Sequence, residues 1–225
     1  MKLPSYYLKR PAIDDSPKVV AAFERLFSEQ IATANGRLIE YQLSAPKWQL
    51  LNYLCDTKDV VMHGSGDPAI SEFEPRQSND VQEFGDQKAV YAASDGIWAS
   101  YFAIVDRDGP VTSLVNSCTK IVFPRKTSET AYFFSINDDA LPHNPWRTGT
   151  VYVLPRETFE MEESLRADRE STQWRSFEPV KPLAKIKVVP EEFPFLDQIR
   201  GHDFDTIQKR ATQDTDGFPW LTEAY

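Results

Sequence analysis

The chain has 225 residues, of which 41% are apolar and 26% charged, a composition typical of a globular protein and unlike that of a fibrous repeat or a disordered chain. Its formal charge of -9 argues against a broad basic face for the phosphate backbone of a nucleic acid. Two cysteines, Cys55 and Cys118, and three histidines far apart in the sequence leave no disulfide framework and no ligand spacing for zinc, so we expect no metal.

The N-terminal residues lack the unbroken apolar segment of a secretory signal, and no run of about 18 apolar residues could span a bilayer. We therefore expect a cytoplasmic protein without a membrane partner. The length suits a single domain over residues 1–225. We expect a helical part in residues 1–57, a strand-rich core in 58–190, and a C-terminal helix and tail in 191–225.

Two helices are predicted near the N-terminus. The first covers residues 16–34, where Ser16 can cap, Pro17 suits the first turn, and apolar residues recur at helical spacing until Asn35 and Gly36. The second covers residues 46–55.

The pattern then changes to strands. Residues 59–63 are β-rich and end at a glycine-rich turn, and a long loop over residues 70–87 leads to a second strand at residues 88–93. Ser94 or Asp95 can cap the helix that follows, which carries Trp98 and Phe102.

Strands and turns dominate the rest of the chain. A charged insert over residues 156–169 is predicted to be helical, and a second, short amphipathic helix is predicted at residues 204–210 near the end of the chain. Two helices followed by a strand-rich core indicate an α+β fold. The later strands are expected at residues 111–115, 118–123, 131–136, 150–154 and 183–189.

Several common site motifs are absent. The sequence contains no GxGxxG, no GxxxxGK[ST] and no GxSxG, which disfavours a Rossmann turn, a P-loop and a nucleophile elbow. His63 and Ser65 lie almost side by side, but neighbouring residues at a strand end point in different directions. A serine hydrolase built on this pair is therefore disfavoured.

The order of short motifs resembles the ADP-ribosyltransferase-like fold. The strand end at His63-Gly64-Ser65 is followed, across the long loop, by the strand carrying Tyr91, then Ser94 and the helix. The resemblance covers about residues 60–103 and extends toward 189. It implies two split antiparallel sheets with N-terminal helices and a small-molecule nucleotide, NAD, bound as substrate in the cleft between them. RNA 2'-phosphotransferases, which are related, fit less well because their set of basic residues cannot be matched.

The resemblance also implies roles for individual residues. His63 would bind ribose hydroxyls, the main chain of Gly64 would hold the nicotinamide carboxamide, and Tyr91 would stack on the nicotinamide ring. Ser65 and Ser94 would lie beside the cofactor, and Arg76 could bind its pyrophosphate. Structural alternatives stay open, because a strand-end histidine, a strand tyrosine and turn glycines are also common in sites without function.

The third element of the family pattern differs here. Such transferases use a glutamate at the start of a late strand, whose carboxylate stabilises the oxocarbenium-like charge as nicotinamide leaves. Gln173 occupies the expected position, with Glu170 as the alternative and Glu157 as a weaker one. Any of them could simply be a solvated surface residue.

Two functions follow from this pattern. The first is an enzyme that cleaves the nicotinamide–ribose bond of NAD and passes ADP-ribose to water or to a protein or nucleic-acid acceptor. The second is a catalytically inactive binding or interaction module on the same fold, favoured by Gln173 and by tail aromatics such as Trp220 and Tyr225. An unrelated α+β hydrolase or sugar-binding enzyme is a third alternative.

Overall fold

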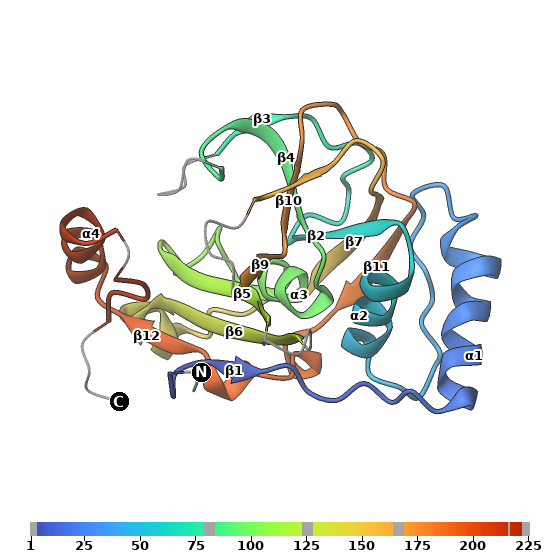
Figure 1. The fold of residues 1–225 in the computed structure, drawn as a ribbon, viewed down its shortest axis with the longest axis horizontal. Helices are drawn as coiled ribbons and strands as arrows, with labels where there is room; N and C mark the ends of the chain where they lie inside the picture. The colour runs from blue at the N-terminus through green and yellow to red at the C-terminus, as the bar shows by residue number, and fades with distance from the viewer. Residues whose placement is uncertain (1–3, 79–83, 123–127, 164–168, 216, 222–225) are drawn as a thin grey trace.

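The chain is described here by a computed structural model, which covers residues 4–78, 84–122, 128–163, 169–215 and 217–221. Two sheets lie next to each other, and helices α2 (Lys47–Thr57) and α3 (Gly96–Ile104) pack beside them (Figure 1). The protein is therefore an α+β protein, as predicted. Within the described ranges, no helix combines the length and the apolar character needed to cross a membrane.

The first sheet is built around a long hairpin. Its strands run in the order β1 (Leu8–Lys9), β6 (Ser128–Asn137), β5 (Leu114–Val122) and β9 (Arg169–Ser171), all antiparallel, and β12 (Arg200–His202) joins β6 in parallel. Helix α4 (Phe204–Gln213) follows β12 at this end of the molecule (Figure 1).

The second sheet is antiparallel throughout. Its order is β11 (Ala184–Val188), β7 (Gly149–Pro155), β2 (Val60–Ser65), β4 (Lys88–Ala93), β10 (Gln173–Ser176) and β8 (Glu160–Met161), while β3 (Arg76–Gln77) pairs with β4. Strands β9 and β10 follow one another directly, so residues 169–176 pass from the first sheet into the second. Buried Thr172 joins them, since its Oγ1 donates to Cys118 O in β5 and its carbonyl accepts from Ser94 N.

Helices α2 and α3 pack against the second sheet. Helix α1 (Pro17–Leu26) continues into the π-helical turn Phe27–Ile31, and short 3₁₀ turns occur at Asp138–His143, Pro190–Glu192 and Leu196–Gln198. Helix α3 is apolar around most of its circumference because it lies between α2, β2 and β7. Its N-cap is Asp95, whose carboxylate accepts the N–H of Trp98, so the cap predicted at Ser94 or Asp95 belongs to Asp95.

Most predicted elements are present. Strand β4 has the predicted bounds, and α1, α2 and α4 overlap their predicted ranges. Strand β5 combines the end of the strand predicted at residues 111–115 with the one predicted at 118–123; it begins at Leu114, so residues 111–113 precede it.

Two predictions are wrong. The sequence predicts a helix for the charged insert, but its described part, residues 156–163 and 169, contains none. Glu160 and Met161 instead form β8, because acidic and apolar residues alternate there and pair with β10. Trp220 is buried against Phe218, and its Nε1 donates to Asp214 O, so it is not an exposed tail aromatic. Tyr225 lies outside the described residues.

Candidate functional site

Strands β2 and β4 separate from each other in the middle of the second sheet. They pair only where Met62 lies opposite Ala93, although both strands continue beyond this point. In the same register His63 would lie opposite Ala92 and Gly64 opposite Tyr91, but neither pair forms. The sheet is therefore open next to the strand end that the sequence singled out.

The register directs the main chain of Gly64 into this opening. Arg156 N donates to Asp59 O, and in an antiparallel ladder such bonded pairs alternate with unbonded ones. His63 consequently exchanges hydrogen bonds with Tyr152 on β7, while the N–H and C=O of Gly64 point away from β7. These two groups can hold a flat amide, which offers one donor and one acceptor at matching spacing.

A close helix contact explains why residue 64 is glycine. An added Cβ would lie 1.8 Å from Ala99 O and 2.8 Å from Ala103 N, both main-chain atoms of α3. The missing side chain thus makes room for α3.

His63 is oriented by a hydrogen bond across the opening. Its Nδ1 lies 2.6 Å from Tyr91 O, and because a carbonyl only accepts, Nδ1 carries the proton and Nε2 keeps a lone pair. Burial lowers the pKa of His63, and the bond to Tyr91 O opposes this shift only in part. The neutral ring packs on Phe73, with 4.6 Å between ring centroids. His63 can therefore accept a hydroxyl hydrogen through Nε2.

The structure does not bring the rings of His63 and Tyr91 to a common wall. His63 lies on the face of the sheet that carries Val61 and Phe73, whereas Tyr91 lies on the opposite face with Arg175. The Tyr91 hydroxyl donates to Phe84 O and accepts from Gln87 N, which fixes the end of the long loop. Its role in this structure is to hold that loop.

Gln173 lies on the same face as Tyr91, and a carboxylate accompanies it. Gln173 pairs with Ala93 on one side, and on the other Glu162 N donates to Gln173 O. The Glu162 carboxylate accepts the Ser171 hydroxyl at 2.5 Å, and Ser171 Oγ accepts Gln173 N. Glu162 is thus the acid next to the position where the family pattern expects one. Sequence reasoning missed it, because the pairing of β8 with β10 is its only signal.

The other predicted residues are dispersed. Glu170 is exposed in the first sheet, opposite Lys120. Arg76 is exposed on β3. Ser65 Oγ accepts the N–H of Asp67 and so belongs to the turn after β2, and Ser94 bonds Thr172 O through its main chain. Ser94 therefore lies beside Gln173, which directly follows Thr172, whereas Glu170 and Arg76 lie on other strands.

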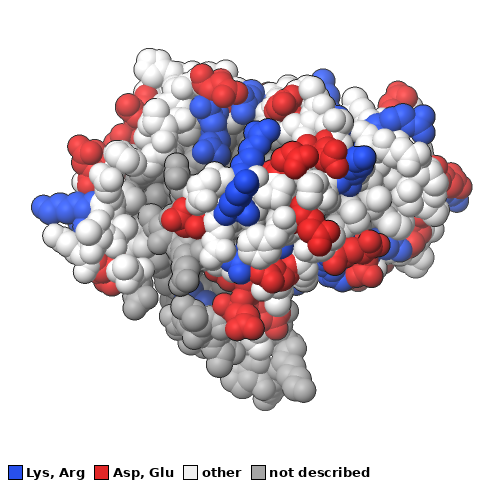
Figure 2. Space-filling model, turned by 90° about the horizontal axis from the view of Figure 1, so that it is seen from above, with Lys and Arg blue, Asp and Glu red and all other residues white. Residues whose placement is uncertain are grey.

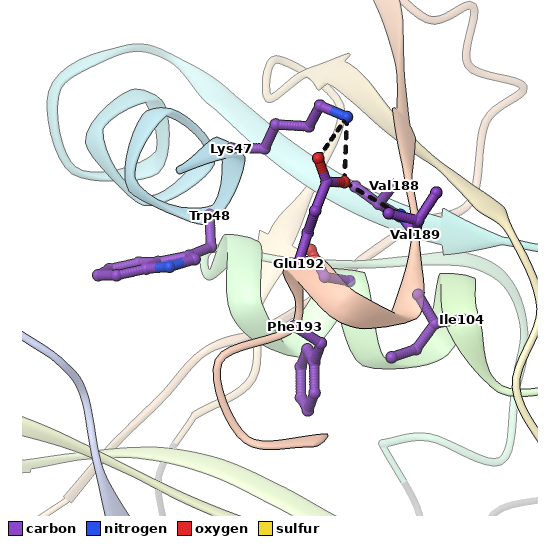
Figure 3. Close-up of a pocket in the computed structure, with 8 residues that line it drawn as sticks. Lys47, Trp48, Ile104, Val188, Val189, Glu192 and Phe193 are labelled. Atoms are coloured by element: carbon purple, nitrogen blue, oxygen red, sulfur yellow. Dashed lines mark hydrogen bonds and ion pairs between the residues drawn. The ribbon is translucent and has the colours of Figure 1, made fainter. Parts of the chain in front are cut away.

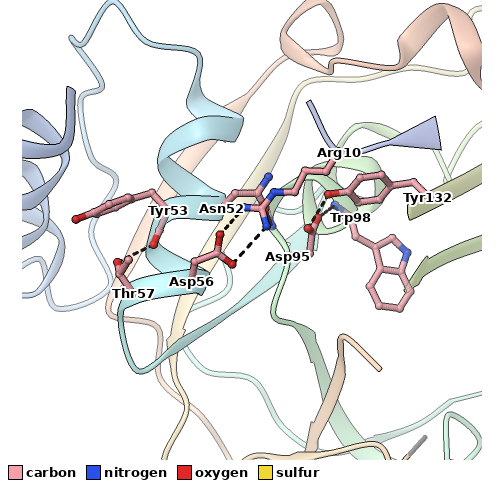
Figure 4. A network of polar contacts seen from close by, with 9 residues as sticks. Arg10, Asn52, Tyr53, Asp56, Thr57, Asp95, Trp98 and Tyr132 are labelled. Carbon is pink, nitrogen blue, oxygen red and sulfur yellow. Dashed lines mark hydrogen bonds and ion pairs between the residues drawn. The ribbon is translucent and has the colours of Figure 1, made fainter. Parts of the chain in front are cut away.

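A buried polar cluster anchors the start of α3 (Figure 4). The Asp95 carboxylate accepts Trp98 N and the Tyr132 hydroxyl, the latter at 2.7 Å, and Gly96 N donates to Asn52 Oδ1. Burial raises the pKa of Asp95, and the Arg10 guanidinium opposes this shift. Because these contacts join α3 to α2 and β6, the cluster sets the position of the helix that packs on Gly64.

Two hollows among the described residues contain none of the predicted cofactor-binding residues. The first, between α2, α3 and the turn Pro190–Glu192, measures about 10 Å³, room for one water, and the Lys47–Glu192 ion pair lies over it (Figure 3). The second is open and measures about 360 Å³; it is lined by Glu157, Glu72, Lys181 and two prolines. The part of the chain that the structure describes also has no group of three residues suited to a metal.

Acidic and basic side chains alternate over the face seen from above in Figure 2, which has no broad basic area among its described residues. Compared with protein-family models, curated proteins and solved structures, the chain shows no match.

Proposed function

We propose that this protein has the ADP-ribosyltransferase-like fold and binds NAD at the opening between β2 and β4, cleaving the nicotinamide–ribose bond. The C–N bond breaks with its electron pair passing to the pyridinium nitrogen. A hydroxyl or amine of a protein or nucleic-acid acceptor, or water, forms the new bond to the ribose carbon and releases a proton. On the sequence grounds given above, we expect this to occur in the cytoplasm.

The observation that carries the proposal is the main chain of Gly64. Its N–H and C=O point away from β7 into the opening, and the neutral His63 ring next to it offers Nε2 to a hydroxyl. A carboxamide and a ribose are ligands of this chemistry. Two mainly antiparallel sheets joined through residues 169–176 also support the fold.

Glu162 is the residue we assign to the acid's role. An amide at Gln173 can hold a ribose hydroxyl but provides no charge, whereas a carboxylate stabilises the cation that develops as nicotinamide leaves. Glu162 lies opposite Gln173 in the ladder and keeps its side chain bonded to Ser171.

The enzyme is tested by incubating purified protein with NAD and following free nicotinamide. We expect release to fall by about 100-fold or more in Glu162→Gln, the scale for removal of one charge-stabilising group. Gln173→Ala is expected to weaken release, and Glu170→Ala to leave it unchanged. Glu163→Gln is the matched control, since Glu163 is the adjacent, exposed carboxylate. Equal rates in the Glu162 and Glu163 variants would refute the assignment.

The second candidate function is a catalytically inactive binding module. It is favoured by the amide at Gln173 and by Tyr91, whose hydroxyl already bonds the loop at Phe84 and Gln87. NAD binding with no nicotinamide release above the rate in buffer would support this module over the enzyme.

A further inference from the structure

A histidine and two serines form a continuous hydrogen-bonded chain in the first sheet, away from the site described above. His202 Nε2 lies 2.9 Å from Ser113 Oγ, and His202 Nδ1 lies 2.7 Å from Ser135 Oγ. The three residues come from β12, from the irregular segment just before β5, and from β6. His202 and Ser135 are buried, while Ser113 is half-buried.

The direction of the protons in this chain can be derived. Ser135 Oγ donates its only hydrogen to Arg200 O, so toward His202 it must accept. His202 Nδ1 therefore carries the proton, and Nε2 has a lone pair. The Ser113 hydroxyl consequently donates to Nε2. A hydroxyl that donates to an imidazole whose other nitrogen is held by a third group is the arrangement of an activated serine.

The main chain near Ser113 is held by Asn137. Thr112 N and Ser113 N both donate to Asn137 Oδ1, which fixes the strand start. Asn137 N donates to Ser113 O, so these two residues form a bonded pair, and the next N–H, that of Leu114, points away from β6. Among the described residues, β9 covers that edge of β5 only from Thr119 to Ile121. The Leu114 N–H therefore has no partner on β6 or β9, but it lies on the side of β5 away from His202, because β12 pairs with the opposite edge of β6.

We propose that Ser113 is a nucleophile with His202 as its base, forming a second reactive site that accepts the acyl group of an activated ester or thioester. Ser113 Oγ bonds to the acyl carbon while its proton passes to His202 Nε2. The ester or thioester bond breaks, and the alcohol or thiol leaves with that proton. Water, deprotonated by the same nitrogen, then releases the acid and restores Ser113.

The surroundings keep His202 available as a base at neutral pH. Burial lowers the pKa of His202, and Asp138 and Asp203 raise it in part. Arg200 lies on the same strand, and Asp139 is bonded to Asn137 Nδ2. The reaction should accelerate as pH rises to neutrality and level off above it.

The test uses a tagged fluorophosphonate, in which Ser113 Oγ would bond to phosphorus and fluoride would leave. We expect one adduct per chain, located on Ser113 by peptide mass spectrometry. It should be lost in Ser113→Ala, slowed about 100-fold in His202→Gln, and unchanged in Thr112→Ala, the neighbouring exposed hydroxyl. An adduct elsewhere, or none, would overturn the proposal.

Loss of the buried imidazole could unfold the protein, so the labelling rate of the unmodified chain is measured as well. With His202 as base, the rate should be nearly constant above about pH 7. A rate that instead keeps rising about tenfold per pH unit is that of an unassisted hydroxyl and would refute the role of His202.

Discussion

Replacing Gly64 by alanine should destabilise the protein through helix α3. The new Cβ would lie 1.8 Å from Ala99 O, whereas ordinary contacts begin near 3.4 Å, so the α3 main chain must retreat by about 1.6 Å. Helix α3 cannot do this freely, because Asp95 anchors its first turn. Overpacking of a core costs roughly 1–3 kcal/mol, and contact with main-chain atoms places Gly64→Ala at about 3 kcal/mol.

The free energy of unfolding in urea measures this cost, and the melting temperature should fall by about 6–12 °C. Gly149→Ala should behave alike, since its Cβ would lie 1.9 Å from Ala103 O. Gly66→Ala is the matched control: the atoms nearest its Cβ belong to the guanidinium end of the Arg147 side chain and not to main chain, so at most the ion pairs of Arg147 with Asp106 and Asp108 are disturbed and the loss should stay below about 1 kcal/mol. If Gly64→Ala proves as stable as Gly66→Ala, the close packing described here is wrong.

Two further predictions concern buried polar groups. Asp95→Ala should lower the free energy of unfolding in urea by about 2–4 kcal/mol, because it removes a helix cap and leaves the Tyr132 hydroxyl unpaired. Asp95→Asn keeps the cap and should cost less than half as much. Equal losses in the two variants would contradict this account. The lowered pKa values of His63 and His202 mean that the unfolded chain takes up protons first on acidification, so stability should be full above about pH 6.5 and decline as pH falls below it. The urea midpoint measured between about pH 5 and 8 checks this decline in stability. The variant His143→Gln, which changes an exposed histidine, should show the same decline. A midpoint that does not change with pH would contradict the prediction.

Features encoded by neighbouring residues could be predicted from the sequence. Strand β4 and helix α3 can be predicted because a β-rich run is followed at once by a capping residue and an apolar segment. The relation between His63 and Tyr91 could not be predicted in this way. Which face each ring occupies depends on the register of β2 against β4, and a shift of one residue reverses the face.

Long-range pairing concealed the remaining site residues. In the sequence alone, Glu162 cannot be distinguished from other charged surface residues; only the pairing of β8 with β10 places it opposite Gln173. Ser113 and His202 are 89 residues apart, and no local pattern indicates that β12 lies beside β6. Sequence reasoning instead weighed His63 with Ser65, which are neighbours in the chain but whose polar atoms bond to different groups, Tyr91 O and Asp67 N.

The Gly64 amide gives the most direct test of the proposed NAD site, by ¹⁵N–¹H correlation spectra recorded during a titration with NAD. Because its N–H points away from β7, this amide should exchange rapidly with solvent in the free protein. On addition of NAD its resonance should shift and its exchange should slow, while the amide of Gly217, in the C-terminal segment, stays unchanged. If NAD leaves the Gly64 amide unaffected at saturating concentration, the nicotinamide carboxamide is not held there and the proposed function fails.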